Sequence, residues 1–244
     1  MKTLDKIDVE FYQKNGYILP QRQLFSPARF AELKAIFEEH LTNKGSKRSD
    51  ELDVPHFTDP RLLNFLLSDE ALDMVEPILG PNIGLWSSHF ISKDPYSGRP
   101  TPWHEDSAYW EGRVSFYSKI VTIWLALDPA TRENGCMRVI PGTHDNGFSA
   151  YEDLANPTAY TFGTQIKNVD ESKAVYFELK PGEFSMHDAR LIHGAEANTS
   201  PNRRCGYTMR YFSTEIKVYP EKNPGFKIWL ARGKDLAGNF YENA

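Results

Sequence analysis

Residues 121–127 read Val-Thr-Ile-Trp-Leu-Ala-Leu, and this stretch decides the fold class. Side chains of a strand alternate between its two faces. The Val, Ile and first Leu side chains therefore share one face, and the Thr, Trp and Ala side chains share the other. Further short runs of β-branched and aromatic residues end at turn residues, and they predict strands over 85–92, 136–140, 173–179, 183–187 and 207–213. Short strands without helices between them are typical of a sandwich, barrel or jelly roll.

Helical signals are confined to the first third of the chain. Ser26 precedes Pro27, which is the pattern of a helix cap followed by proline at the first helical position, and apolar residues follow at helical spacing to Leu41. Three more helices are predicted over 8–17, 60–67 and 68–79, the first with Phe11 as its core residue. We therefore expect a mainly β protein with N-terminal helices (α+β). Residues 1–83 would form a helical layer on a jelly roll of residues 84–244, in one domain.

Composition excludes several classes of protein. The net charge is −5 and no basic stripe stands out, which argues against a nucleic-acid partner. Two cysteines give no disulfide framework and favour a reducing, cytoplasmic location. No apolar run reaches the 18 residues that a membrane span needs. The sequence leaves the oligomeric state open.

His104 and Asp106 form a His-x-Asp motif, and His193 follows far downstream. Two imidazoles and one carboxylate are the ligands of the facial triad that holds non-haem Fe(II) with open positions. Residues i and i+2 of a strand point the same way, so the first two can reach one ion. A rival pair, His187 and Asp188, chelates poorly because adjacent strand residues face opposite sides. His187 could instead face the pocket, where it would contact the substrate or one of the metal-binding residues.

Four stretches of the sequence resemble the phytanoyl-CoA dioxygenase family of Fe(II)- and 2-oxoglutarate-dependent oxygenases. Phe-Tyr-Gln-Lys-Asn-Gly-Tyr at 11–17 resembles the opening of that family, and Thr-Pro-Trp-His-Glu-Asp at 101–106 its first metal motif. Trp-Leu-Ala-Leu-Asp at 124–128 and residues 133–144 resemble its central segment. His193-Gly194-Ala195 and Arg204 resemble its distal motif. The resemblance covers nearly the whole chain and implies a cupin-like double-stranded β-helix.

The resemblance implies that His104, Asp106 and His193 bind the iron and that Arg204 binds the far carboxylate of 2-oxoglutarate. Chemistry supports the arginine independently, because a guanidinium fork fits a carboxylate better than an ammonium does. Arg203 is the adjacent competitor, but it would face the opposite side of the strand. The family also places contacts to the cosubstrate at the positions of Trp124, His89 and Lys93. Thr122 shares the face of Trp124 and is a further candidate for contact with the cosubstrate.

The implied reaction uses Fe(II), 2-oxoglutarate and O₂, releases succinate and CO₂, and hydroxylates a C–H bond of a small molecule. Related halogenases lack the metal-binding carboxylate, so Asp106 favours hydroxylation or desaturation over halogenation. Desaturation, epoxidation and cyclisation would use the same ligands and stay open as alternatives. A non-catalytic, metal-binding jelly roll is the alternative from another class.

Candidate substrate contacts lie around the metal motif and on the last strand. Tyr109 and Trp110 follow Asp106 and could face the substrate or belong to the core. Arg210 shares a face with Arg204 and could bind an anionic substrate or form a structural ion pair. The long connection 148–168 has the length of a segment that covers an active site.

Overall fold

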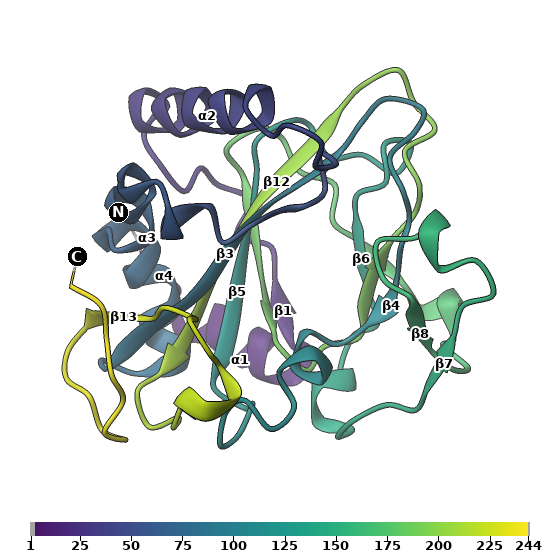
Figure 1. Ribbon diagram of the computed structural model, residues 1–244. Helices are drawn as coiled ribbons and strands as arrows, with labels where there is room; N and C mark the ends of the chain where they lie inside the picture. Colours follow the sequence, from purple (N-terminus) through teal and green to yellow (C-terminus); the bar gives the residue numbers. More distant parts are fainter. Residues whose placement is uncertain (1–2, 244) are drawn as a thin grey trace.

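The computed structural model describes residues 3–243 and contains two antiparallel sheets that face each other (Figure 1). The major sheet has the order β1 (Tyr17–Ile18), β10 (Phe184–Asp188), β5 (Ile120–Ala126), β12 (Arg204–Ser213), β3 (Ile83–Lys93) and β13 (Trp229–Arg232), and β2 (Leu52–Asp53) also pairs with β3. The minor sheet has the order β4 (Thr101–His104), β11 (His193–Ala195), β6 (Met137–Val139) and β9 (Val175–Tyr176). This arrangement confirms the predicted jelly roll.

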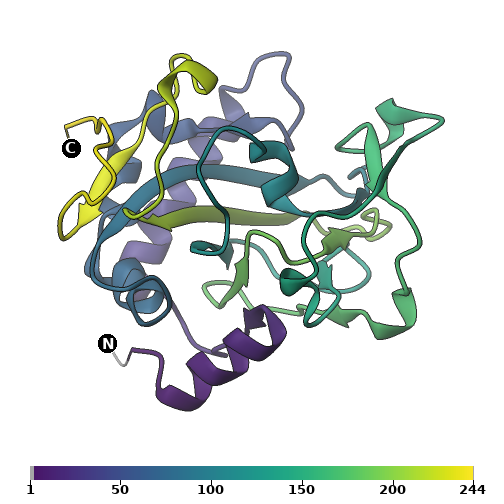
Figure 2. The same ribbon diagram turned by 90° about the horizontal axis from the view of Figure 1, so that it is seen from below.

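Among residues 3–243, four α-helices precede β3: α1 (Lys6–Asn15), α2 (Pro27–Thr42), α3 (Leu63–Leu66) and α4 (Asp69–Leu79). α2, α3 and α4 lie on the side of the major sheet that faces away from the minor sheet (Figures 1 and 2). α1 lies beside β1 at the edge of the major sheet, and the carbonyl oxygens of Gln13 and Asn15 near its end bond to His144 and Gly142, which follow β6. The predicted start of α2 is confirmed, because Ser26 caps the helix and Pro27 is its first residue. The predicted helix over 68–79 is confirmed as well, with Ser68 at its N-cap.

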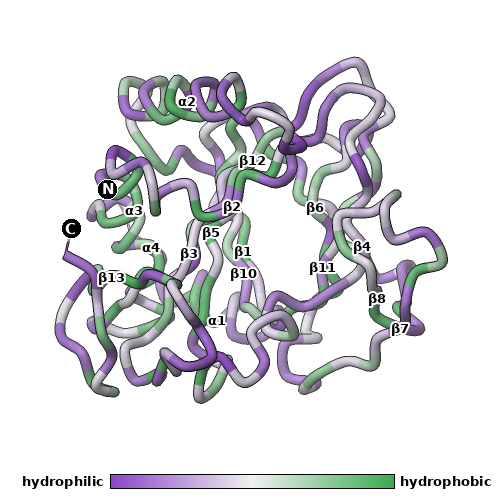
Figure 3. Tube along the Cα trace, viewed as in Figure 1, coloured by the Kyte–Doolittle hydropathy of each residue, from purple (hydrophilic) through white to green (hydrophobic). Residues whose placement is uncertain are grey.

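The largest core lies between these helices and the major sheet. One face of β5 contributes Val121, Ile123 and Leu125 to it, and the helices contribute residues such as Phe37 and Met74. Hydrophobic residues accordingly gather along α4 and the central strands (Figure 3). The other face of the sheet points toward the minor sheet. Thr122, Trp124 and the charged residues of β12 therefore face the space between the two sheets.

One prediction about the core was wrong. Phe11 is 43% exposed, and the neighbouring Tyr12 is the buried residue of α1. Residues one apart on a helix point about 100° apart, so a small error in helix phase exchanges the inner and outer side chains. Phe11 instead meets the ring of Tyr17 edge-on, with a centroid distance of 5.4 Å.

Two segments differ from the predicted elements. The strand expected over 173–179 is reduced to β9, preceded by a short 3₁₀ turn at Glu171–Lys173. Residues 214–243, for which no element was predicted, return to the major sheet, where β13 pairs with β3. Within residues 3–243, no helix combines the length and apolar character needed to span a bilayer.

Candidate active site

Three buried side chains with metal-binding atoms converge between the two sheets. His104 ends β4, Asp106 begins the 3₁₀ helix η3 (Asp106–Trp110), and His193 begins β11 directly opposite His104. Each residue offers one ligand atom, and the three atoms lie within 4.8 Å of one another. The Nε2 atoms of His104 and His193 lie 3.8 and 4.0 Å from Oδ1 of Asp106. The pairing of β4 with β11 thus brings together ligands that are far apart in the sequence.

Both imidazoles are oriented by the backbone. Nδ1 of His104 lies 2.8 Å from the carbonyl oxygen of Pro102, and Nδ1 of His193 lies 2.9 Å from that of Leu191. A carbonyl can only accept, so Nδ1 carries the proton and the Nε2 lone pair is free for a metal. Burial lowers the pKa of both rings, that of His104 to about 3, so they remain neutral ligands in mild acid.

The carboxylate of Asp106 has two distinct sides. Its Oδ2 accepts a hydrogen bond from Nε of Arg210 at 3.1 Å and lies 3.4 Å from Oγ1 of Thr122. Oδ1 faces the two imidazoles. Burial raises the pKa of Asp106, but Arg210 and the neighbouring imidazoles outweigh burial and hold it well below its usual range. Two imidazole nitrogens and one carboxylate oxygen fit a non-haem Fe(II).

His187 lies beside these ligands. It pairs with Thr122 across β10 and β5, and its Nε2 lies 3.9 Å from Oδ2 of Asp106. Neither of its ring nitrogens has a hydrogen-bond partner within the described chain, and burial holds its pKa well below the usual value. Asp188 points away and pairs with Arg190 at 2.9 Å. The structure therefore does not bring His187 and Asp188 together as a chelating pair.

Arg204 lies buried at another part of the same cavity. Its Nε and Nη2 donate to the carbonyl oxygen of Gly135 at 3.1 and 2.8 Å, and its guanidinium stacks on Trp124, 5.0 Å from the ring centroid. Its Nη1 is buried and has no partner among the described residues. Burial lowers its pKa to about 10, so it remains a cation at neutral pH. A buried donor without an acceptor fits the carboxylate of a cosubstrate.

A glycine makes room for this arrangement. A Cβ atom placed on Gly206 would lie 2.0 Å from Cζ2 of Trp124. Any side chain at that position would push the indole into the space beside Arg204. The sequence held no signal for this contact, because it depends on the pairing of β12 with β5.

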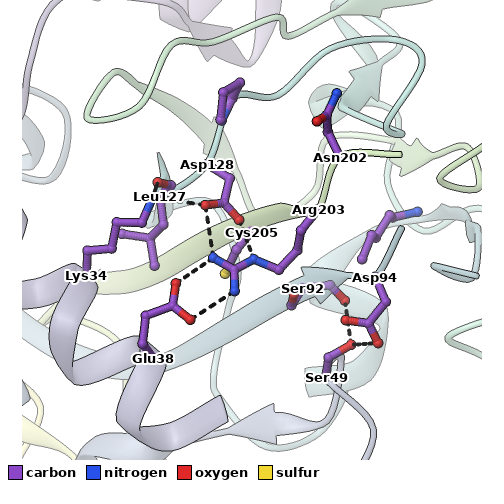
Figure 4. Close-up of polar contacts among 12 residues, drawn as sticks. Lys34, Glu38, Ser49, Ser92, Asp94, Leu127, Asp128, Asn202, Arg203 and Cys205 are labelled. Carbon is purple, nitrogen blue, oxygen red and sulfur yellow. Dashed lines mark hydrogen bonds and ion pairs between the residues drawn. The ribbon is translucent and has the colours of Figure 1, made fainter. Parts of the chain in front are cut away.

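Arg203 points to the opposite side of β12, as predicted from strand alternation. It donates to Asp128 at 2.7 Å and forms a two-bonded pair with Glu38 of α2, next to Lys34 (Figure 4). These ion pairs join the helical layer to the major sheet. The guanidinium of Arg203 is therefore engaged outside the cavity, and Arg204 is the one that faces it.

The remaining predicted cosubstrate contacts have different positions relative to the cavity. His89 lines the cavity, and burial lowers its pKa. Thr122 reaches the site only through Asp106. Lys93 is buried and donates to the carbonyl oxygens of Arg99 at 2.7 Å and Glu196 at 2.5 Å, and it is absent from the described cavity wall.

A cavity of about 470 Å³ is lined by the three metal-binding residues and by Arg204, Trp124 and His89. This volume is within the usual range for small-molecule sites. Tyr109, Trp110, His187 and Arg210, the candidate substrate contacts, all line it. Sequence reasoning missed several of its other lining residues: Trp86, Arg113, Phe162 and Phe226. They come from a strand bulge and from irregular segments, where periodicity gives no signal.

The long connection lies against the metal-binding residues. It carries the hairpin of β7 (Tyr151–Asp153) and β8 (Thr164–Ile166). The Phe162 ring lies 4.9 Å from the His104 ring and 4.8 Å from the Tyr109 ring. At its start, the backbone N–H and hydroxyl of Ser149 both bond to the buried carboxylate of Glu105. The connection therefore forms part of the cavity wall in this conformation.

Comparison with known proteins places the chain in a family. The family model described as phytanoyl-CoA dioxygenase matches residues 12–206. A Caenorhabditis elegans protein named phytanoyl-CoA dioxygenase domain-containing protein 1 homolog is 26% identical over 210 residues, which are 79% of this chain and 71% of that protein.

Solved structures share the fold. The non-haem monooxygenase ThoJ has a TM-score of 0.79 at 22% identity, with 96% of this chain and 87% of that chain covered. EvdO2 from Micromonospora carbonacea var. aurantiaca, solved with 2-oxoglutarate, has a TM-score of 0.74 at 25% identity and covers 89% of this chain and 94% of its own. This chain is therefore a non-haem oxygenase that uses Fe(II), 2-oxoglutarate and O₂, and it belongs to the phytanoyl-CoA dioxygenase family.

Proposed function

We propose that the protein hydroxylates a C–H bond of a small molecule and converts 2-oxoglutarate to succinate in the same turnover. One observation carries this proposal: three converging metal-binding atoms and a buried arginine with an unpartnered Nη1 share one cavity. Fe(II) and 2-oxoglutarate, when bound there, activate O₂ for oxidation of the C–H bond. Asp106 supplies the carboxylate that halogenases lack, which supports hydroxylation.

Each residue has a defined part in this proposal. His104, Asp106 and His193 hold the iron through Nε2, Oδ1 and Nε2. Arg204 binds the far carboxylate of 2-oxoglutarate through Nη1, while Gly135 fixes the other side of its guanidinium. Arg210 holds the second oxygen of Asp106, so that one oxygen is left for the metal.

We further propose that residues 1–244 act as one catalytic unit. The support is the largest core cluster, which runs from Leu4 in the N-terminal segment to Trp229 in the last strand and includes residues of α2, α4 and the major sheet. The helical layer would then stabilise the sheet that carries Arg204 and Arg210.

Anaerobic titration of the Fe(II)-loaded protein with 2-oxoglutarate tests the proposed site. We expect a weak visible charge-transfer band, which should be absent in His104→Ala and in His193→Ala. His40→Ala, which changes a histidine paired with Asp59 outside the cavity, is the matched control and should keep the band. Iron binding without any band would remove 2-oxoglutarate from the site, and a normal band in either ligand variant would remove that residue from the metal.

A further inference from the structure

Arg113 is a cavity arginine without a carboxylate partner. It follows η3 and lines the same cavity as the metal-binding residues. Of the other cavity arginines, Arg99 forms a two-bonded pair with Asp50, and Arg210 pairs with Asp106. Arg204 is reserved in our proposal for the cosubstrate. Within the described chain, no carboxylate oxygen lies within 4 Å of the Arg113 guanidinium.

The side chain of Arg113 is held in one position. Its Nε donates to Oδ1 of Asn223 at 2.7 Å, and the amide nitrogen of Asn223 donates back to the Arg113 carbonyl oxygen at 2.9 Å. The guanidinium carbon lies 5.1 Å from the Trp86 ring centroid and 4.9 Å from that of Phe226. These contacts involve the faces of the Trp86 and Phe226 rings and the Nε donor of Arg113. The Nη1 and Nη2 donors remain without a partner in the described structure, and neither is a fully buried atom.

Arg113 and Arg204 lie at different ends of the cavity. Arg210 is six residues after Arg204 on β12, a distance of roughly 20 Å along an extended strand. The Arg210 guanidinium lies over Trp110 at 5.7 Å, and the Trp110 ring lies 5.8 Å from the Trp86 ring. Arg113 stacks on Trp86 and therefore belongs to the Arg210 end. A ligand held by Arg113 would not compete with one held by Arg204.

A strand bulge aims Trp86 into the cavity. Arg210 pairs with Ser87 and Tyr211 pairs with Leu85, so Trp86 has no partner on β12. A bulge turns a side chain that would otherwise follow strand alternation. Trp86 thus lines the cavity together with Ser87, and it supplies the flat surface on which Arg113 lies.

The charge of Arg113 is only weakly compensated. Burial lowers its pKa, and the acidic residue that opposes this shift is Asp53, an exposed cavity residue beyond ion-pair distance. A partly desolvated cation with free N–H donors gains from an anionic acceptor. Stacking on two aromatic rings fixes the guanidinium in advance, which lowers the entropic cost of binding.

We infer that the substrate is an organic anion, and that Nη1 and Nη2 of Arg113 bind its acid group while its carbon skeleton extends past Trp86 and Tyr109 toward the metal-binding residues. This inference rests on the proposed function and adds the class of substrate. Carboxylates and phosphate esters share the required pair of anionic oxygens. Neutral molecules of the same shape lack it.

Matched compound pairs test the inference. The probes are carboxylic acids with their primary amides, and phosphate monoesters with their parent alcohols, all built on small aromatic or branched skeletons. Binding is followed by tryptophan fluorescence of the metal-free protein, and succinate formation by the complete enzyme gives a second readout. The charged member of each pair should bind at least ~10-fold more tightly than the neutral member, because a charge-assisted hydrogen bond to Arg113 typically contributes that much affinity. Tighter binding of the carboxylates than of the phosphate esters, or the reverse, would identify the acid group of the substrate.

Arg113→Gln should abolish the preference for the charged partner of each pair, and Arg113→Lys should keep part of it. Arg132→Gln is the matched control, because Arg132 also lies over an aromatic ring but stands outside the cavity. Equal binding of acids and neutral partners, binding of no acid, or an unchanged preference in Arg113→Gln would overturn the inference. If Arg113→Gln does not fold, an unchanged preference in Arg113→Lys overturns it. Failure of the proposed function would appear separately, as loss of the 2-oxoglutarate band in the unmodified protein.

Discussion

Arg203, which precedes β12, and Arg204, its first residue, have opposite surroundings although they are adjacent in the sequence. Arg203 is held by Glu38 and Asp128 on the helical side, and Arg204 has only a carbonyl oxygen and an aromatic ring on the cavity side. Strand alternation was enough to predict this division. It could not predict the carbonyl of Gly135, because that contact depends on a loop whose conformation leaves no periodic signal.

Replacement of Arg204 by glutamine should weaken 2-oxoglutarate binding. The bound dicarboxylate would lose a buried charged partner, typically a loss of ~3–5 kcal/mol. Titration of the visible band measures the dissociation constant. Arg203→Gln is the control. It should lower the free energy of unfolding in urea, because it breaks the contacts between Glu38 of α2 and the residue that precedes β12, and it should leave the affinity for 2-oxoglutarate unchanged. Reversed results would exchange the roles of the two arginines.

Arg210→Met should weaken metal binding. Oδ2 of Asp106 would lose its cationic donor, and loss of a group that orients a ligand typically costs 10–100-fold in metal affinity. The dissociation constant of Co(II), measured by its absorption spectrum in the metal-free protein, is the readout. Thr122→Val removes only a 3.4 Å contact to the same oxygen and should have a smaller effect. Unchanged Co(II) affinity in Arg210→Met would contradict an orienting role.

At the level of elements, the sequence predicted the faces of β5 and β12 and the limits of α2 and α4. Regular alternation and helix caps are local signals, so one sequence suffices for them. The bulge at Trp86 and the position of Asp106 at the start of η3 were not predictable, since both depend on neighbouring strands. Phe11 shows the same limit, because the phase of a short helix is set by what it packs on.

The long connection should loosen when Ser149 is changed to alanine. Ser149 donates its hydroxyl to the buried carboxylate of Glu105, and a hydrogen bond to a charged group contributes ~1.5–3 kcal/mol. We expect amide hydrogen exchange to rise across residues 148–168. Ser172→Ala is the control, because Ser172 bonds to the exposed Asp170 in the neighbouring turn. An unchanged exchange pattern would show that other contacts hold the connection.

At the scale of the whole molecule, the cavity is built from segments that are far apart in the sequence and that no local sequence pattern relates to one another. The fold class was predictable, because many short strands and few helices leave few alternatives. The cavity was not, because it also requires the C-terminal segment, whose Asn223 and Phe226 hold Arg113. Contacts between residues more than a hundred positions apart leave no trace in one sequence.

The stability of the protein should fall in mild acid, partly through His56. This buried ring packs against Phe57 and Trp229, and burial lowers its pKa to about 3. Between that value and the ordinary value near 6.5, the unfolded chain takes up a proton that the folded protein does not. Stability therefore decreases as pH falls from 6.5, by ~1.4 kcal/mol per pH unit for one such group.

Urea unfolding of the metal-free protein between pH 7 and pH 4 measures this slope. His56→Gln should make it shallower, although the variant will be less stable at pH 7 because it loses the ring contacts. An NMR titration in which His56 gains a proton near pH 6 would contradict the prediction directly.

The arginines that serve the cosubstrate and the metal site lie on a different part of the fold from the residues proposed to surround the substrate. Arg204 and Arg210 lie on one central strand, whereas Arg113, Phe162 and Phe226 come from connecting segments. Mutation can reshape a connecting segment without shifting a strand that is paired on both sides. Descendants of this gene could therefore acquire new substrates by drift and selection in the loops, while the oxidative chemistry was inherited intact. A lineage of such enzymes would diverge fastest around position 113 and slowest along β12.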